Sequence, residues 1–169
     1  MRHCRLLIPL MLVVVLSAFV LGACGTRGLI DYKNEEWGYT VRYPYSWKLE
    51  VSTDGKVCVG TAPSKKGSFR IDVVEGLSAR DVAQRWLMSI GTAYKEVAML
   101  ENKPSGDKFW DWYLAYEYET EYYGTFHGEA FFKQVRGRVY KIDTLAEKEL
   151  YSKYPFPVIV SSFKVTTKE

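Results

Sequence analysis

The chain is poor in the two side chains from which most metal and acid–base sites are built. Its 169 residues include two histidines and three cysteines. His3 and Cys4 stand at the very start, so the rest of the chain holds one imidazole and two thiols, those of His127, Cys24 and Cys58. A disulfide framework needs several cysteine pairs, and a zinc-binding His-Glu-x-x-His helix needs two histidines. The sequence excludes both.

A short apolar segment near the start is the clearest functional signal in the chain. Arg2 and Arg5 precede an apolar run over residues 6–21, which is too short for a typical membrane span but fits an export signal. The run ends in Leu-Gly-Ala-Cys at residues 21–24. This tetrad resembles the bacterial lipobox, in which the cysteine sulfur receives a diacylglycerol and the peptide is cut directly before it. We therefore predict a lipoprotein signal peptide over residues 1–23 and lipidation of Cys24.

A lipid on Cys24 would hold the protein on the outer side of a membrane. Acyl chains such as palmitate, at about 0.8 kcal/mol for each buried CH₂ group, anchor a domain without any spanning helix. Residues 24–28 then form the lipidated cysteine and a short tether, and residues 29–169 have the length of one domain. We expect an extracytoplasmic, membrane-anchored protein at the cell surface or on the periplasmic side.

The chain lacks the excess of positive charge that would indicate a nucleic-acid partner. The chain has 23 basic and 20 acidic residues, and loss of Arg2 and Arg5 with the signal leaves 21 basic residues. This near-neutral balance argues against nucleic-acid binding. Gly-Lys-Ser/Thr loops, Cys-x-x-Cys pairs and Gly-x-Ser-x-Gly turns are also missing. We expect a protein that is not an enzyme, with a hydrolase triad around His127 as the third-ranked alternative.

Hydrophobic periodicity predicts a mixture of strands and helices. The expected elements are a hairpin of strands at 39–43 and 47–51, strands at 56–61 and 69–73, a helix capped by Ser78 that reaches Tyr94, strands at 95–102, 109–121, 125–134 and 138–145, a helical turn at 147–154 and a helix at 155–163. Cys58 lies in the alternating run Val57-Cys58-Val59, which favours a buried, inert thiol over a nucleophile.

Two glycines set the expected register of the last three long strands. Gly124 and Gly137 each end a candidate three-residue hairpin loop, because glycine readily adopts a positive φ angle. Directly paired residues share one face of a sheet. On this register Tyr116 faces Ala130, so that a large side chain lies against a small one.

The same register lines up acidic side chains on one face. Glu117 falls opposite Glu129, and Glu129 opposite Asp143. Like charges that face each other destabilise a sheet, so the row requires a cation. Lys133 and Lys141 could supply it, or a divalent cation such as calcium, manganese or zinc could bind. The metal hypothesis assigns the ligands to Glu117, Glu119, His127, Glu129 and Asp143.

Aromatic residues make up 15% of the chain, and several fall in predicted loops. Most of the others occupy alternating strand positions and are expected in the core. A set in or near the loops could grip a protein or a glycan, or could fold back onto the sheet. The candidate binding residues are Trp37, Tyr45, Tyr122 and Tyr123.

The order of elements and two local motifs resemble the PsbP family, which includes the extrinsic protein of photosystem II and bacterial lipoproteins. The motifs are Trp-Gly-Tyr-Thr-Val-Arg-Tyr-Pro-Tyr-Ser-Trp at residues 37–47 and Ser-Ser-Phe-Lys-Val at residues 161–165. The resemblance covers residues 29–165 and implies an α+β fold, an antiparallel β-sheet flanked by helices in an α/β/α sandwich. It also implies a non-enzymatic accessory or assembly factor with an envelope protein as partner. The alternative is a metal- or small-ligand-binding lipoprotein that uses the acidic row.

Overall fold

The computed structural model describes residues 28–166. The predicted signal peptide, the lipidation site Cys24 and all of the tether except Gly28 lie outside the described residues. None of the helices in the described part is both long and apolar enough to cross a bilayer.

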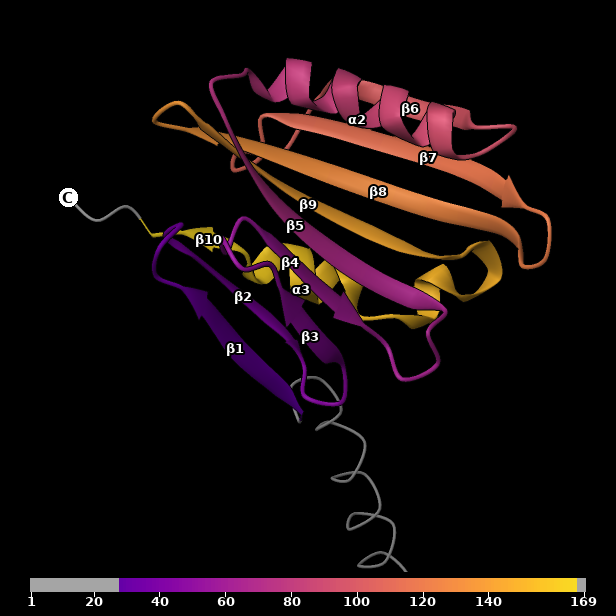
Figure 1. Cartoon of the computed structure of the whole chain (residues 1–169), viewed down its shortest axis with the longest axis horizontal. Coiled ribbons are helices and arrows are strands. Elements are labelled where there is room, and N and C mark those ends of the chain that lie inside the picture. Colours follow the sequence, from indigo (N-terminus) through magenta and orange to yellow (C-terminus); the bar gives the residue numbers. More distant parts are fainter. Residues whose placement is uncertain (1–27, 167–169) are drawn as a thin grey trace, which may run out of the picture.

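A seven-stranded antiparallel sheet forms the centre of the domain (Figure 1). Its strands, in spatial order, are β3 (Lys48–Val51), β4 (Val57–Thr61), β5 (Gly67–Glu75), β9 (Arg138–Glu147), β8 (Gly124–Val135), β7 (Trp112–Thr120) and β6 (Ala98–Pro104). Strands that are consecutive in the chain pair with each other except at the centre, where β5 pairs with β9. The predicted α+β class is confirmed.

A smaller sheet covers part of one face. It contains β1 (Leu29–Asn34), β2 (Tyr39–Pro44) and β10 (Lys164–Val165), in the order β1-β2-β10. The predicted hairpin between residues 39–43 and 47–51 is therefore wrong, because β2 and β3 belong to different sheets. Both edges of β2 are already paired, one with β1 and the other with β10. Trp47, in the connection, is buried and stacks on Phe69 of the larger sheet.

Helices lie on both faces of the larger sheet. α2 (Ala79–Ala93) begins after Ser78, whose hydroxyl accepts the Asp81 N–H at 3.1 Å, as the capping pattern predicts. α2 packs on β7 and β8. The opposite face carries the small sheet, the 3₁₀ helix η1 (Lys148–Lys153) and α3 (Phe156–Ser162), which packs on β2 (Figure 1). The far layer of the predicted sandwich is thus a small sheet together with α3.

The registers of the β7–β8 and β8–β9 pairs both differ from the predicted ones. Thr120 pairs with Gly124, so β7 is shifted by two residues against β8 and keeps its predicted faces. Val135 pairs with Arg138, so the β8–β9 loop is the two-residue turn Arg136-Gly137. Both turn residues have positive φ, 49° and 78°, as a type I′ hairpin requires. This shift of one residue moves β9 to the other face relative to the prediction.

In the observed register, as in the predicted one, a large side chain of β7 lies against a small residue of β8, although the paired residues differ. Tyr116 is buried and faces Gly128 across the β7–β8 pair, where the prediction placed Ala130. A Cβ atom at Gly128 would overlap the Tyr116 ring. Gly128 therefore leaves the space that this tyrosine fills.

We predict that Gly128→Ala destabilises the domain by about 1–3 kcal/mol, because the added methyl group must displace a buried ring. The matched control is Gly106→Ala, since a Cβ atom there meets nothing within 4 Å. Urea denaturation of the two variants and the native protein measures the difference. Equal stability of the two variants would contradict the packing described here.

Candidate functional site

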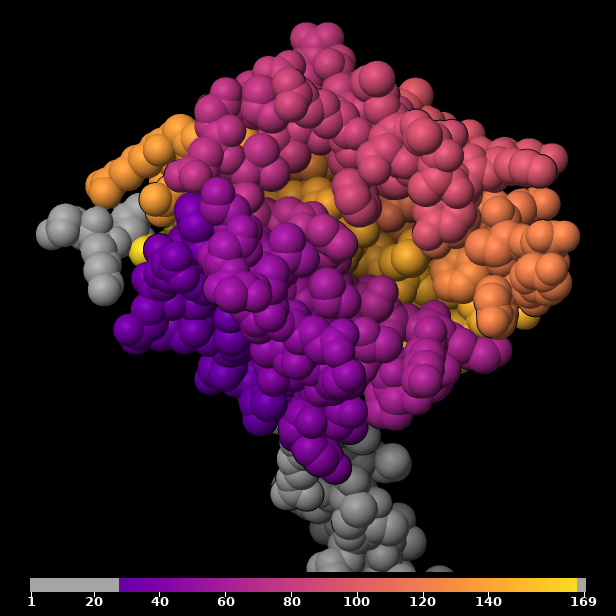
Figure 2. All heavy atoms as spheres, viewed as in Figure 1, coloured from indigo at the N-terminus to yellow at the C-terminus, as the bar shows by residue number. Residues whose placement is uncertain are grey.

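A groove runs beside helix α2, where the helix leaves part of the sheet uncovered. One helix with its side chains is about 10 Å wide and strands lie about 4.8 Å apart, so a single helix covers only two or three of seven strands. The step between α2 and strands β4 and β5 encloses a groove of about 410 Å³. Figure 2 shows the surface hollowed between the pink helix and the purple strands, with orange atoms of later strands visible deeper in.

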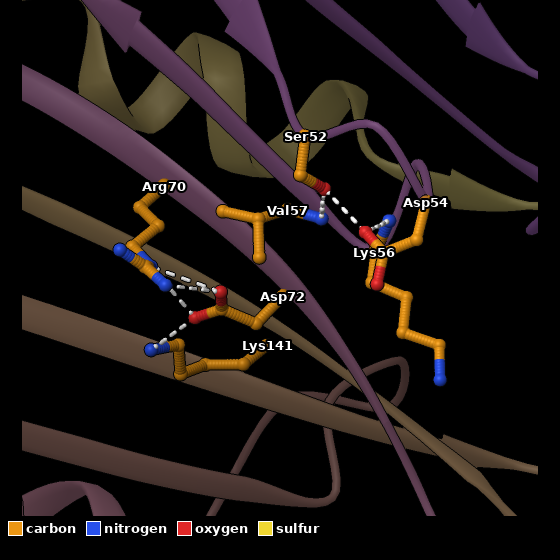
Figure 3. Close-up of polar contacts among 7 residues, drawn as sticks. All are labelled: Ser52, Asp54, Lys56, Val57, Arg70, Asp72 and Lys141. Carbon is orange, nitrogen blue, oxygen red and sulfur yellow. Dashed lines mark hydrogen bonds and ion pairs between the residues drawn. The ribbon is translucent and has the colours of Figure 1, made fainter.

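The floor of the groove carries a chain of ion pairs that crosses from β5 to β9 (Figure 3). Asp72 Oδ2 lies 2.6 Å from Lys141 Nζ, and the guanidinium of Arg70 contacts Asp72 at 2.9 Å. The strand register causes this arrangement, because Asp72 pairs with Lys141 and Arg70 pairs with Asp143. Lys141 is only 2% exposed, and its ammonium group lies 2.9 Å from the ring centroid of Trp86 on α2.

Asp143 is the second buried carboxyl group of this network. It accepts a hydrogen bond from the Tyr116 hydroxyl at 3.0 Å. Burial raises the pKa of Asp143 to about 6, although the Lys141 charge and the Tyr116 hydrogen bond act in the opposite direction. Burial also lowers the pKa of Lys141, against the attraction of Asp72 and Asp143. For Asp72, burial is outweighed by Lys141 and Arg70, which leave its pKa lowered.

The rim of the groove is more basic than its floor. Arg85 on α2 and Lys56, just before β4, both line it. Asp54 also lines it, but its carboxylate accepts the Ser52 hydroxyl at 2.6 Å and the Lys56 N–H at 3.1 Å (Figure 3). The hydrogen bonds of the Asp54 carboxylate therefore stabilise the turn in which it lies.

This network was not predicted from the sequence, although a signal for it exists. Arg70-x-Asp72 and Lys141-x-Asp143 each place opposite charges two residues apart, in segments whose other residues are mostly apolar. Such alternation predicts one charged face on each strand. Only the central pairing of β5 with β9 brings the two faces together, and that pairing joins strands about seventy residues apart in the chain.

The structure splits the predicted acidic row. His127 Nδ1 lies 3.2 Å from Glu117 Oε1, and His127 Nε2 lies 3.5 Å from Glu129 Oε1. Glu119 shares their face but is exposed and pairs with Thr125 nearer the hairpin. The inclusion of Asp143 is wrong, because the two-residue β8–β9 turn places it opposite Ala130, on the face that α2 covers.

The cations that neutralise this row are also different from those predicted. Lys148 Nζ binds Glu117 Oε2 at 2.8 Å. Lys133 instead contacts Asp111, and Lys141 lies on the other face with Asp72. Among residues 28–166, no group of three or more His, Cys, Asp or Glu side chains is placed to hold a metal ion. Binding of a divalent cation by the remaining acidic residues stays a prediction.

The predicted aromatic binding residues do not form one surface. Trp37 is buried, and its indole N–H donates to the Asp54 carbonyl at 2.8 Å. Tyr45 is 71% exposed in the β2–β3 connection. Tyr122 and Tyr123 are 81% and 70% exposed at the tip of the β7–β8 hairpin. The exposed members therefore belong to two separate loops.

The predicted burial of Cys58 is confirmed. Cys58 is free and fully buried within β4. Burial raises the pKa of its thiol to about 12, so the reactive thiolate is scarce at neutral pH.

Comparison with solved structures assigns this architecture to a known fold. No protein-family model matches the sequence, and no curated protein matches it. The solution structure of cyanobacterial PsbP from Synechocystis sp. PCC 6803 superposes with a TM-score of 0.65 over 86% of this chain and 98% of that one, at 20% identity. The chain has the PsbP fold. The resemblance inferred from the sequence motifs is thus confirmed at the level of the fold.

Two further solved structures share the PsbP fold. LpqN of Mycobacterium tuberculosis, described as involved in cell envelope biogenesis, matches at 12% identity with a TM-score of 0.56, over 82% of this chain and 91% of LpqN. A Bacteroides thetaiotaomicron protein matches at 13% identity with a TM-score of 0.55, over 85% of this chain and 50% of that protein. Identities this low show a common fold, and activity must be argued from the sites.

The carboxylates around His127 in this PsbP-fold domain lead to a prediction about its pKa. Hydrogen bonds that the ring N–H groups donate to Glu129 and Glu117 favour the imidazolium and raise that pKa above 6.5, although burial opposes them. The pKa of His127 is higher in the folded than in the unfolded protein, so protonated His127 stabilises the folded domain. This stabilisation is complete below about pH 6.5 and is lost as the pH rises through the folded pKa. NMR titration measures it directly, since His127 is the one histidine of the described residues.

Glu129→Gln should lower the His127 midpoint more than Glu117→Gln does, because Glu117 shares its charge with Lys148. Glu119→Gln, on the same face, is the control and should leave the midpoint unchanged. A midpoint at or below 6.5 in the native protein would refute the carboxylate cage around this imidazole.

The buried network leads to a further prediction. We expect Lys141→Met to cost about 3–5 kcal/mol of unfolding free energy, because it removes the buried cation that faces Asp72 and Asp143. Lys133→Met is the matched control on the neighbouring strand, and the loss of its partly exposed pair with Asp111 should cost about 1 kcal/mol or less. Urea denaturation at neutral pH measures both, and equal losses would show that Lys141 does not compensate this cluster.

Proposed function

We propose that this chain is an extracytoplasmic lipoprotein, anchored to a membrane through Cys24, that acts without catalysis as an accessory or assembly factor in the cell envelope. The observation that carries the proposal is the Leu-Gly-Ala-Cys box at residues 21–24, directly after an export-type apolar run. The box predicts lipidation, and it stands a few residues before the first strand, which begins at Leu29.

The position of Gly28 supports a close approach of the domain to the membrane. Its carbonyl accepts the Tyr45 N–H at 2.7 Å, so the first described residue is fixed against the β2–β3 connection. Four residues after Cys24 extend at most about 14 Å. A lipid on Cys24 would therefore bring the exposed ring of Tyr45 near the bilayer interface, where tyrosine side chains are favoured.

A binding role is supported by the chemistry of the described residues. The imidazole of His127 lies between two carboxylates, and the thiol of Cys58 is fully buried. Neither group is placed as an activated nucleophile or as a free base. A shared fold with LpqN, a protein described as involved in cell envelope biogenesis, favours an envelope role for this chain as well.

The β7–β8 hairpin tip is the surface that we assign to a protein partner. Tyr122 and Tyr123 expose most of their surface at its end. Adjacent exposed tyrosines supply large contact areas with little loss of side-chain entropy, and this makes tyrosine a frequent anchor at protein interfaces. Loop aromatics were among the binding residues expected from sequence, and these two remain accessible in the fold.

Cys24→Ser tests the anchor. We expect the native protein to occur in the membrane fraction with an acylated amino-terminal cysteine, as detected by mass spectrometry. The variant should lack acylation and should retain residues 1–23. Cys58→Ala is the control, because a buried thiol takes no part in processing. An unmodified amino terminus in the cytosolic fraction of the native protein would overturn the proposal.

The partner is tested in the same cells with a photo-crosslinking residue at Tyr123 and, as control, at Met88, which is equally exposed on α2. We expect one discrete envelope protein to be captured from Tyr123 in the native background, and far less of it in the Cys24→Ser background. Equal capture patterns from both positions would argue against the hairpin tip as the contact surface.

A further inference from the structure

The groove beside α2 has the size and lining of a small-molecule site. Its volume of about 410 Å³ lies within the range of roughly 300–1,000 Å³ that ligand pockets occupy. Apolar side chains form most of its walls. They come from β4, β5, the turn before α2 and α2 itself, and they include Val57, Val74, Leu77, Val82 and Trp86. The body of a ligand would therefore contact carbon.

The charges that line the groove select the sign of that ligand. Four cationic side chains line it, namely Lys56, Arg70, Arg85 and Lys141, against two carboxylates, those of Asp54 and Asp72. The carboxylate of Asp72 forms ion pairs with Arg70 and Lys141. The carboxylate of Asp54 accepts two hydrogen bonds within its own turn. A cationic ligand or a metal ion would find no uncommitted carboxylate there.

Donors for an anion, in contrast, remain. Arg85 makes no hydrogen bond or ion pair with any residue in the part of the chain that the structure describes. Arg70 binds Asp72 through Nε and one terminal nitrogen, which leaves part of its five-donor fork unused. These two guanidinium groups come from α2 and β5, the two elements that form the sides of the groove. Arginine is also the side chain best suited to bidentate contact with carboxylates.

We propose that this groove binds an organic anion that combines one carboxylate with an apolar body. The carboxylate meets Arg85 and Arg70, and the body lies along Trp86 and the valines of β4 and β5. The ion pairs on the floor keep Lys141 and Asp72 satisfied when the groove is empty, so an occupant has no buried charge to neutralise. This site is independent of the lipid anchor and of the hairpin tip.

The test uses the full-length protein and an eight-carbon aliphatic carboxylate that carries a diazirine in its chain. After irradiation, peptides that contain residues 70–74 and 82–86 should carry the label, as located by mass spectrometry. The amine of the same length is the charge-inverted probe and should label these peptides far less. Excess octanoate should compete with the carboxylate probe.

Arg85→Glu should lower labelling of the groove peptides about fivefold or more, because attraction at the rim becomes repulsion. Arg80→Glu is the matched control, since it makes the same charge change on the same helix but lies outside the groove. The proposal is overturned if carboxylate and amine label equally, if label concentrates outside the groove, or if both variants reduce labelling alike. Circular dichroism confirms that the two variants are folded.

Discussion

β5 and β9 pair along the whole length of β5 at the centre of the larger sheet; one face of this pair is buried, and the other forms the floor of the groove beside α2. On the face of the small sheet, Phe69, Ile71 and Ile142 enter an aromatic core. On the face of α2, the same strands carry Arg70, Asp72 and Lys141. A buried charge is costly unless it is paired, so the register that aligns these residues cannot slip without leaving ions uncompensated. The ion network therefore constrains strand pairing in addition to the apolar core.

Much of the fold could be read from local sequence, and the two main failures have different causes. The helix capped by Ser78 and the short helix behind Pro155 follow from local signals and are present. The hairpin expected from residues 39–51 is absent because the partners of β2 come from the two ends of the described chain. The β8–β9 register was wrong by one residue because Arg136 adopts a left-handed φ that local reasoning reserves for glycine.

The left-handed φ of Arg136 explains most of what could not be predicted from the sequence about the sites. It separates Asp143 from Glu129 and so divides the expected ligand set between two faces of the sheet. It also brings Lys141 and Asp143 against Asp72 and Arg70, which creates the floor of the groove. The association of Glu117, His127 and Glu129 was predictable because the β7–β8 shift of two residues preserves faces. The burial of Trp37 was not, since Trp37 packs into a core formed by residues distant in the chain, and its indole N–H donates to the Asp54 carbonyl.

The burial of Cys58 has a practical consequence for redox chemistry. It is the one free cysteine among residues 28–166, and burial raises the pKa of its thiol so far that little thiolate forms at neutral pH. Thiol–disulfide exchange proceeds through the thiolate, so this domain should be indifferent to the oxidising or reducing character of its surroundings. A cysteine introduced on the surface of residues 28–166 would then be the one reactive thiol in that part of the chain, which allows a spectroscopic label to be placed there without altering the native core.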